Sequence, residues 1–192
     1  MDIHENNDRT IKIQGQHHRY QIKKATKSKK HVSTREVPND FLNHSTQRDM
    51  IELMYLNGDV KGDVKGVVKD EDLSLCHMIE KELKIKLRNY TQQDKKSKRY
   101  DDAFFIQYEE VLGKLVESKL KCYYCKGSVF MIYSKSHDDC QWTLERLNND
   151  LGHNASNIVI SCLGCNLGRR TMNSDAYRFT KQLQIVKSNK ED

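Results

Sequence analysis

Two pairs of cysteines, Cys122-x2-Cys125 and Cys162-x2-Cys165, constrain this chain more than any other feature. Each pair can present two thiolates from one tight turn, and two such turns supply the four ligands of a tetrahedral zinc ion. The chain opens without a secretory signal pattern, so we expect reduced thiolates on metal rather than disulfides. The other two cysteines, Cys76 and Cys140, are each expected to be a buried free thiol.

The amino-acid composition indicates how large the hydrophobic core can be. Hydrophobic residues make up 36% of the 192 and charged residues 31%, which predicts a small core that depends on the metal. The net charge of +6, from 33 basic and 27 acidic residues, favours a polyanionic partner. No apolar run approaches the ~18 residues of a membrane span. We therefore expect an intracellular protein with no membrane partner, in the cytoplasm or the nucleus.

The residues around the second cysteine pair form a polar pattern: Glu145-Arg146, Gly152-His153, Asn157 before Ile-Val-Ile, and Asn166 directly after the last cysteine. In its order and spacing this pattern resembles the HNH endonucleases of the ββα-metal nuclease superfamily, in their zinc-knuckle form. The resemblance covers residues 122–170. One position departs from the usual motif, because the residue after the acid is Arg146 where most members have the histidine general base; some members, including phage ones, carry such an acid-Arg pair.

The resemblance implies an α+β fold, with a zinc-stapled ββα-metal HNH module in the C-terminal half, preceded by helices and a basic, partly disordered N-terminal arm. It also implies a phosphodiester hydrolase that cuts or nicks DNA. Glu145 and Asn166 would bind the catalytic Mg²⁺ or Mn²⁺, Asn157 would hold the loop between the strands, and the zinc on the four cysteines would be structural. Arg146 stays protonated, so it would clamp the phosphate.

The general base is left open by the sequence. His153 is the first candidate because an imidazole titrates near neutrality. His137 is the second, and a hydroxide on the metal that needs no side-chain base is the third. After the last cysteine pair, Arg169 and Arg170 are expected to contact DNA phosphates.

Three segments organise the chain. Residues 1–66 form the N-terminal arm with a short helix at 45–56 and a Gly-rich linker, residues 67–120 a helical segment, and residues 121–192 the zinc-bound module. Apolar spacing predicts helices over 71–90 and 104–120, with a strand as the alternative at 84–88 and a basic loop at 92–99. Within the module we expect strands at 128–133, 141–146 and 157–161 and helices at 165–171 and 174–187.

Two other functions stay open. One alternative is a zinc-stabilised nucleic-acid-binding module without catalysis. Arginine at position 146, where the general base is usually found, favours this interpretation. A zinc-held protein-interaction domain has no positive support beyond the two predicted helices. The sequence does not determine the cleavage site, the choice between a nick and a double-strand break, or the pathway. Because one ββα unit cuts one strand, a homodimer is the expected route to a double-strand break.

Overall fold

A two-stranded antiparallel sheet lies beside the second cysteine pair. Strand β1 (Trp142–Arg146) pairs with β2 (Ile158–Cys162), with Trp142 opposite Cys162 and Arg146 opposite Ile158. Helix α5 (Leu163–Arg169) follows β2 without a break and packs against both strands. The α+β class, this strand pair and this helix are confirmed, with boundaries one or two residues from those predicted.

The computed structural model describes residues 33–57 and 70–184, together with Gly15. Ser33–Asp192 form one compact unit. The hypotheses about a basic N-terminal arm and a Gly-rich linker fall largely outside the described residues. The remaining elements of the described part are η1 (Asn39–Leu42), α2 (His44–Asn57), α3 (Asp70–Lys96), α4 (Tyr108–Ser118), η2 (Ala155–Asn157) and α6 (Ser174–Gln182).

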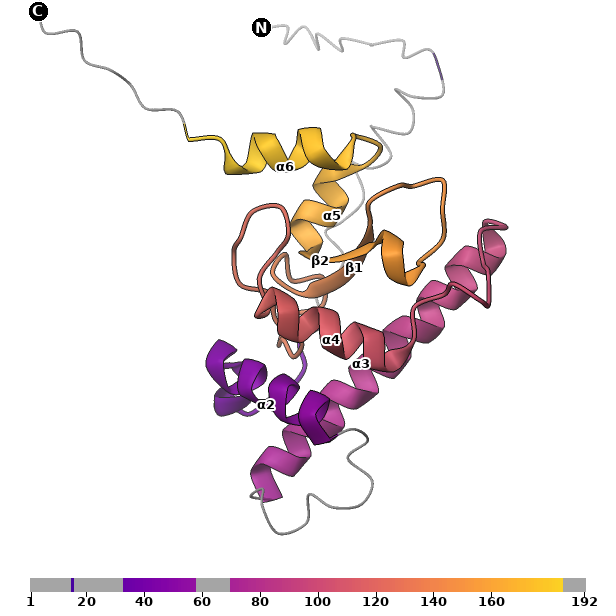
Figure 1. Ribbon diagram of the computed structural model, residues 1–192. Coiled ribbons are helices and arrows are strands. Elements are labelled where there is room, and N and C mark those ends of the chain that lie inside the picture. The colour runs from indigo at the N-terminus through magenta and orange to yellow at the C-terminus, as the bar shows by residue number, and fades with distance from the viewer. Residues whose placement is uncertain (1–14, 16–32, 58–69, 185–192) are drawn as a thin grey trace, which may run out of the picture. The chain divides into compact units, whose positions relative to one another are not determined.

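Helices cover the sheet. In Figure 1, α5 and α6 are drawn above the strands and α4 with α2 below them, and α4 contacts β2. Helices α2, α3 and α4 also contact one another. The predicted stripe on α3 is buried at Cys76, Ile79 and Leu83, each at most 1% exposed, as expected for a helix that packs its apolar face on the core.

The helix predicted over 71–90 is confirmed, and 84–88, where a strand was the alternative, lie inside it. The basic loop predicted at 92–99 is wrong over residues 92–96, which continue α3. Basic side chains suit the last turn of a helix because they oppose its negative dipole end. Helix α4 begins only after Gln107, whose backbone N–H donates to the Glu110 carboxylate in a capping box, so residues 104–107 stay outside it.

The strand predicted at 128–133 is also absent from the described sheet. The buried amide of Gln47 takes the place of a neighbouring strand: its oxygen accepts from the backbone N–H of Met131 and Ile132, and its nitrogen donates to the Ile132 carbonyl. Phe130 bonds instead to Cys140 and Trp142. The backbone groups of this apolar segment are therefore satisfied without a regular ladder.

Candidate functional site

The four cysteines of the two pairs come together as a candidate zinc site. Their four sulfur atoms all lie within 4.8 Å of one another, and Cys125 Sγ is 3.9 Å from Cys162 Sγ. Around a tetrahedral zinc with bonds of about 2.3 Å, sulfur atoms are separated by about 3.8 Å. Three of the cysteines are buried and Cys125 is exposed. The cluster therefore fits a zinc ion closed by four thiolates.

Local backbone structure positions each pair. In the first, Cys122 and Gly127 are joined by a backbone hydrogen bond of 2.8 Å, and Lys126 adopts a left-handed conformation with φ of 60°. In the second, Cys162 is the N-cap of α5 and its sulfur accepts from the Cys165 N–H at 3.4 Å. Tyr123 N–H donates to the Ile160 carbonyl at 2.8 Å, which attaches the first pair to β2.

Electrostatics at the cluster favour a cation. A hydrogen bond from the Cys162 thiol is the largest cause that lowers the pKa of Cys122 to about 4. Burial is the largest cause that raises the pKa of Cys165 to about 12, followed by the charge on Cys122. One thiolate is thus stabilised and its neighbours resist ionisation. A dication at the centre removes this repulsion, which is how metal sites keep coordinating thiols deprotonated.

Beside the sheet lies an open cleft of about 540 Å³. It gathers five of the residues that the sequence singled out, and α3 with the segment after it forms part of its wall. Its lining consists of Tyr90, Gln93, Arg99, Thr143, Leu144, Glu145, Arg146, Asn149, His153, Leu163, Asn166, Leu167, Arg170 and Thr171. Glu145, Arg146, His153, Asn166 and Arg170 are therefore brought together, whereas Asn157, His137 and Arg169 do not line the cleft.

Glu145 lies near the end of β1 and is 6% exposed. Its Oε1 accepts from Arg169 Nε at 2.5 Å. Burial raises the pKa of Glu145, and the nearby Arg169 guanidinium opposes that rise. Within the described residues, no hydrogen bond engages Oε2, so this oxygen remains available to a ligand in the cleft.

Arg169 is a buried structural residue. It is 2% exposed and donates to Glu145, to the carbonyls of Met172 and Arg146, and to Asn149 Oδ1, at 2.5–2.7 Å. These bonds tie the end of α5 to the end of β1. The expectation of a phosphate contact from Arg169 does not agree with this placement, because its guanidinium is already occupied. Arg170 is exposed and lines the cleft.

Asn166 lies on α5 directly after Cys165 of the cysteine cluster. Its Nδ2 donates to Thr143 Oγ1 at 3.3 Å, which leaves Oδ1 without a partner among the described residues. Glu145 Oε2 and Asn166 Oδ1 are oxygens of the kind that hard divalent cations prefer. The described residues contain no second group of three or more His, Cys, Asp or Glu ligands. A cation here would take these two oxygens and fill its shell with water and phosphate.

Asn157 anchors the loop between the strands. Its Oδ1 accepts from the Asn148 N–H at 2.9 Å, and its Nδ2 donates to the carbonyls of Asn148 and Gly152 at 2.9 and 3.0 Å. The side chain is 5% exposed. This geometry matches a loop-holding role and gives Asn157 no direct access to the cleft lining.

His153 is buried at 2% exposure and its ring contacts α3. His153 Nδ1 lies 2.8 Å from Asp94 Oδ1, and the His153 backbone N–H donates to Asp94 Oδ2 at 2.6 Å. The Tyr90 ring packs on the imidazole with centroids 4.3 Å apart. Burial lowers the pKa of His153, and the Asp94 carboxylate opposes that fall. The ring is therefore biased toward the neutral form that accepts a proton.

Asp94, Tyr90 and Arg99 were missed by the sequence analysis. Asp94 is 59 positions from His153 and sits in a run of basic residues that looked like a loop. Arg99 is exposed, lines the cleft, and lowers the pKa of Arg146 after burial, which is the larger cause. Arg146 itself donates to the carbonyls of Asn149 and Leu151. Asp94 is buried only because α3 continues past the predicted helix end, so the sequence gives no signal that it meets His153.

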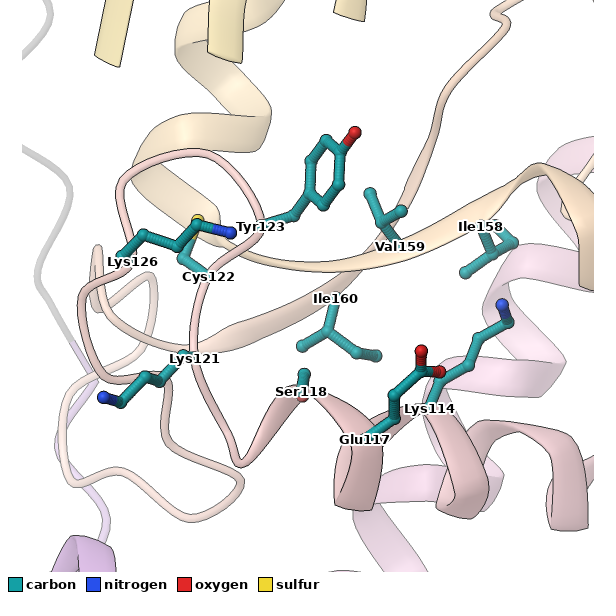
Figure 2. A pocket seen from close by; sticks show the side chains of 10 residues that line it. All are labelled: Lys114, Glu117, Ser118, Lys121, Cys122, Tyr123, Lys126, Ile158, Val159 and Ile160. Atoms are coloured by element: carbon teal, nitrogen blue, oxygen red, sulfur yellow. The ribbon is translucent and has the colours of Figure 1, made fainter. Parts of the chain in front are cut away.

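A second cavity of about 420 Å³ lies between α4, β2 and the first cysteine pair. Figure 2 shows its lining, which consists of Lys114, Glu117, Ser118, Lys121, Cys122, Tyr123, Lys126, Ile158, Val159 and Ile160. Its polar residues are lysines, one glutamate, one serine and one tyrosine, with no histidine or amide side chain. It therefore lacks the acid–amide pair and the imidazole that the cleft provides.

Comparisons with protein-family models, curated proteins and solved structures found no match to this chain. In the described part of the chain, no helix has both the length and the apolar character to cross a membrane.

Proposed function

We propose that this protein is a metal-dependent DNA endonuclease or nicking enzyme of the HNH type, stabilised by structural zinc. One observation carries the proposal: a single cleft beside the strand pair and α5 collects Glu145, Arg146, His153 and Asn166. Hydrolysis of a phosphodiester needs a cation, a group that activates water, and positive charge around the phosphate. The cleft offers residues for each of these requirements.

Glu145 and Asn166 are the proposed protein ligands of a Mg²⁺ or Mn²⁺ ion. When bound, such an ion neutralises charge on the scissile phosphate and on the leaving oxygen. Their two unengaged oxygens support this assignment, because the other polar atom of each side chain is already fixed by Arg169 or Thr143. Both ligands are therefore held in place before a cation arrives.

Three arginines supply the phosphate-binding charge in the proposal. Arg99, Arg146 and Arg170 all line the cleft and come from three different parts of the chain. A guanidinium donates two parallel hydrogen bonds to a phosphate and stays charged at any physiological pH. Together they offset the negative charge that develops on the phosphoryl oxygens.

His153 is the proposed general base. The oxygen of a water molecule attacks phosphorus while His153 Nε2 takes the proton of that water. The bond from phosphorus to the leaving oxygen then breaks, its electron pair stays on that oxygen, and the oxygen acquires a proton from solvent. One cleft cuts one strand, so a single copy of the chain is expected to nick duplex DNA.

A nucleic-acid-binding module without catalysis is the second candidate function. The ion pair from Arg169 to Glu145 favours it, because a guanidinium 2.5 Å from the carboxylate competes with a cation for the same charge. Both proposals predict DNA binding in the basic cleft. They differ in whether the bound strand is hydrolysed.

Incubation with supercoiled plasmid in Mg²⁺ or Mn²⁺ separates the two. We expect the wild-type chain to convert plasmid to the nicked form, and the Glu145→Gln/Asn166→Ala variant to bind DNA without cutting it. Glutamine keeps a hydrogen-bond acceptor for Arg169, so the variant should remain folded. A Lys114→Ala/Lys121→Ala variant, altered only in the second cavity, is the matched control and should cut normally. Wild-type binding without cleavage in either metal would establish the binding module instead.

A further inference from the structure

We propose that Asp94, on α3, positions the His153 imidazole so that its Nε2 accepts the proton in the cleft. The inference rests on the proposed nuclease function and adds a residue that lies outside the cysteine-bounded segment. Asp94 does not line the cleft, so it acts through His153 and is a positioning residue. In this proposal, helix α3 contributes to the active site as well as to the hydrophobic core.

The Asp94 carboxylate contacts His153 at two points, the backbone N–H and the ring Nδ1. Asp94 is fully buried at 0% exposure, and its two oxygens are each used: Oδ2 accepts from the His153 backbone N–H at 2.6 Å and Oδ1 faces the ring Nδ1 at 2.8 Å. The first bond fixes the backbone and the second fixes the rotation of the ring.

This arrangement selects one tautomer of the neutral ring. An ionised carboxylate only accepts hydrogen bonds, so Nδ1 must carry the hydrogen and Nε2 must carry the lone pair. No described residue bonds to Nε2, and His153 lines the cleft, so the lone pair is available to a water there. The geometry thus prepares the nitrogen that the reaction needs.

The groups facing the ring have opposing effects. Asp94 and the Tyr90 ring come from α3, Arg146 from β1, and Arg99 follows α3 at the cleft wall. Burial and the charge of Arg146 lower the pKa of His153, whereas Asp94 raises it. The Tyr90 hydroxyl accepts from the Leu144 N–H at 3.2 Å, so it is anchored to β1 and keeps the ring packed. Asp94 therefore orients the ring without forcing it into the protonated form.

Gly152 leaves the space that the contact between Asp94 and His153 requires. A Cβ built at this position would overlap the carbonyl oxygen of Arg99 and would lie 2.9 Å from Asp94 Oδ2. Only a residue without a side chain lets the loop approach the end of α3 this closely. The backbone bond from Ile106 N–H to the His153 carbonyl, at 2.9 Å, holds the other side of the same residue.

The first test is the tautomer of His153 in the full-length wild-type protein. Two-dimensional ¹⁵N–¹H spectra of the imidazole distinguish a ring protonated at Nδ1 from one protonated at Nε2, and a His153→Gln sample assigns the signals. We expect the Nδ1-protonated form near pH 7.5. The opposite tautomer would overturn the inference whether or not the protein cuts DNA.

The second test is Asp94→Asn. The asparagine oxygen can still accept from the His153 N–H, but its amide now donates to Nδ1 and moves the ring hydrogen to Nε2. We expect kcat for plasmid nicking to fall by about 100-fold or more, as for loss of a general base, with KM changed by less than about threefold. The matched control is Asp102→Asn, the same substitution at an exposed acid outside the cleft, with wild-type activity expected.

The pH profile separates positioning from mere stabilisation. In the wild type, cleavage should rise with pH along a single limb as the lowered pKa of His153 is passed, and Asp94→Asn should lose that limb. A folded Asp94→Asn protein with wild-type kcat would overturn the inference. If the wild type never cuts, the nuclease proposal fails, and the inferred role in proton transfer fails with it. The spectra would then report only how Asp94 orients the ring.

Discussion

Arg169 Nε lies 2.5 Å from Glu145 Oε1, and the two side chains are 2% and 8% exposed. The pair joins the last turn of α5 to the end of β1, at the edge of the cleft. Both the position of Glu145 and the direction of α5 therefore depend on one guanidinium. The two residues are 24 positions apart in sequence, so their ion pair joins the two ends of the segment that runs from β1 to α5.

Arg169→Ala should unfold the protein more readily, because it leaves the Glu145 carboxylate buried and unpaired. Removal of one partner from a buried ion pair typically costs about 3–5 kcal/mol. Urea denaturation followed by circular dichroism measures the loss. The neighbouring Arg170→Ala, at an exposed position, should change the free energy of unfolding by about 0.5 kcal/mol or less. Equal losses for the two variants would show that the pair is not structural.

Zinc removal should release the sheet and α5. A zinc ion held by all four thiolates would have no open position and would contribute directly to folding, so a strong chelator should lower the thermal midpoint sharply. Cys122→Ser should have a similar effect, whereas Cys140→Ser, at an exposed thiol outside the cluster, should not. Identical melting curves with and without chelator would rule out a structural metal.

Gly152→Ala should destabilise the loop where it meets α3. The added methyl group overlaps a backbone carbonyl, which cannot move as a flexible side chain does, and such overpacking costs about 1–3 kcal/mol. Gly113→Ala is the matched control. Its Cβ would meet only the Tyr55 ring, at 3.4 Å, and alanine in a helix interior is favoured over glycine by roughly 0.5–1 kcal/mol. A stable Gly152→Ala protein would contradict the close approach seen here.

Lys86 should make stability depend on pH above neutrality. Its ammonium group donates to the Trp142 carbonyl and lies 4.4 Å from the centre of the Trp142 ring. Burial lowers the pKa of Lys86 to about 7, so between pH 7 and the ordinary lysine pKa the unfolded chain binds more protons than the folded one. The free energy of unfolding should therefore rise with pH in this window, by at most about 1.4 kcal/mol per pH unit.

Lys86→Met tests this dependence. The methionine keeps an unbranched chain over Trp142 but does not titrate, so the difference between wild type and variant should change steadily from pH 7 to pH 9. Denaturation at several pH values in one buffer system measures it. Parallel curves for the two proteins would mean that the amine keeps its ordinary pKa in the fold.

Local signals in the sequence were sufficient for the four-cysteine cluster, the strand pair and α5. The Cys-x2-Cys spacing indicates two thiolates per turn, and the residues at 141–146 and 157–161 indicate the strands. The resemblance to the HNH endonucleases directed attention to five residues that line the cleft. Long-range contacts were beyond it, because nothing near Asp94 in the sequence indicates that it meets His153.

Long-range hydrogen bonds made by side chains account for the strand wrongly predicted at 128–133 and for the burial of Arg169. Gln47 satisfies the backbone at Met131 and Ile132 from a helix more than 80 positions away, so an apolar run that resembles a strand is not one. Arg169 was expected to contact DNA phosphates, yet four of its five N–H groups donate to internal acceptors. Burial of a charged residue is decided by the partner that the tertiary fold brings to it.

Cys162 is the last residue of β2 and the N-cap of α5, and its sulfur faces the other three cysteines. Anyone who wishes to graft a different helix onto this scaffold must therefore keep the opening turn of α5 intact. The graft must also keep Ser174 and Tyr177, which are buried and contact Tyr124 from beyond that helix. Protein engineers would find only the exposed positions of α6, such as Phe179, open to redesign.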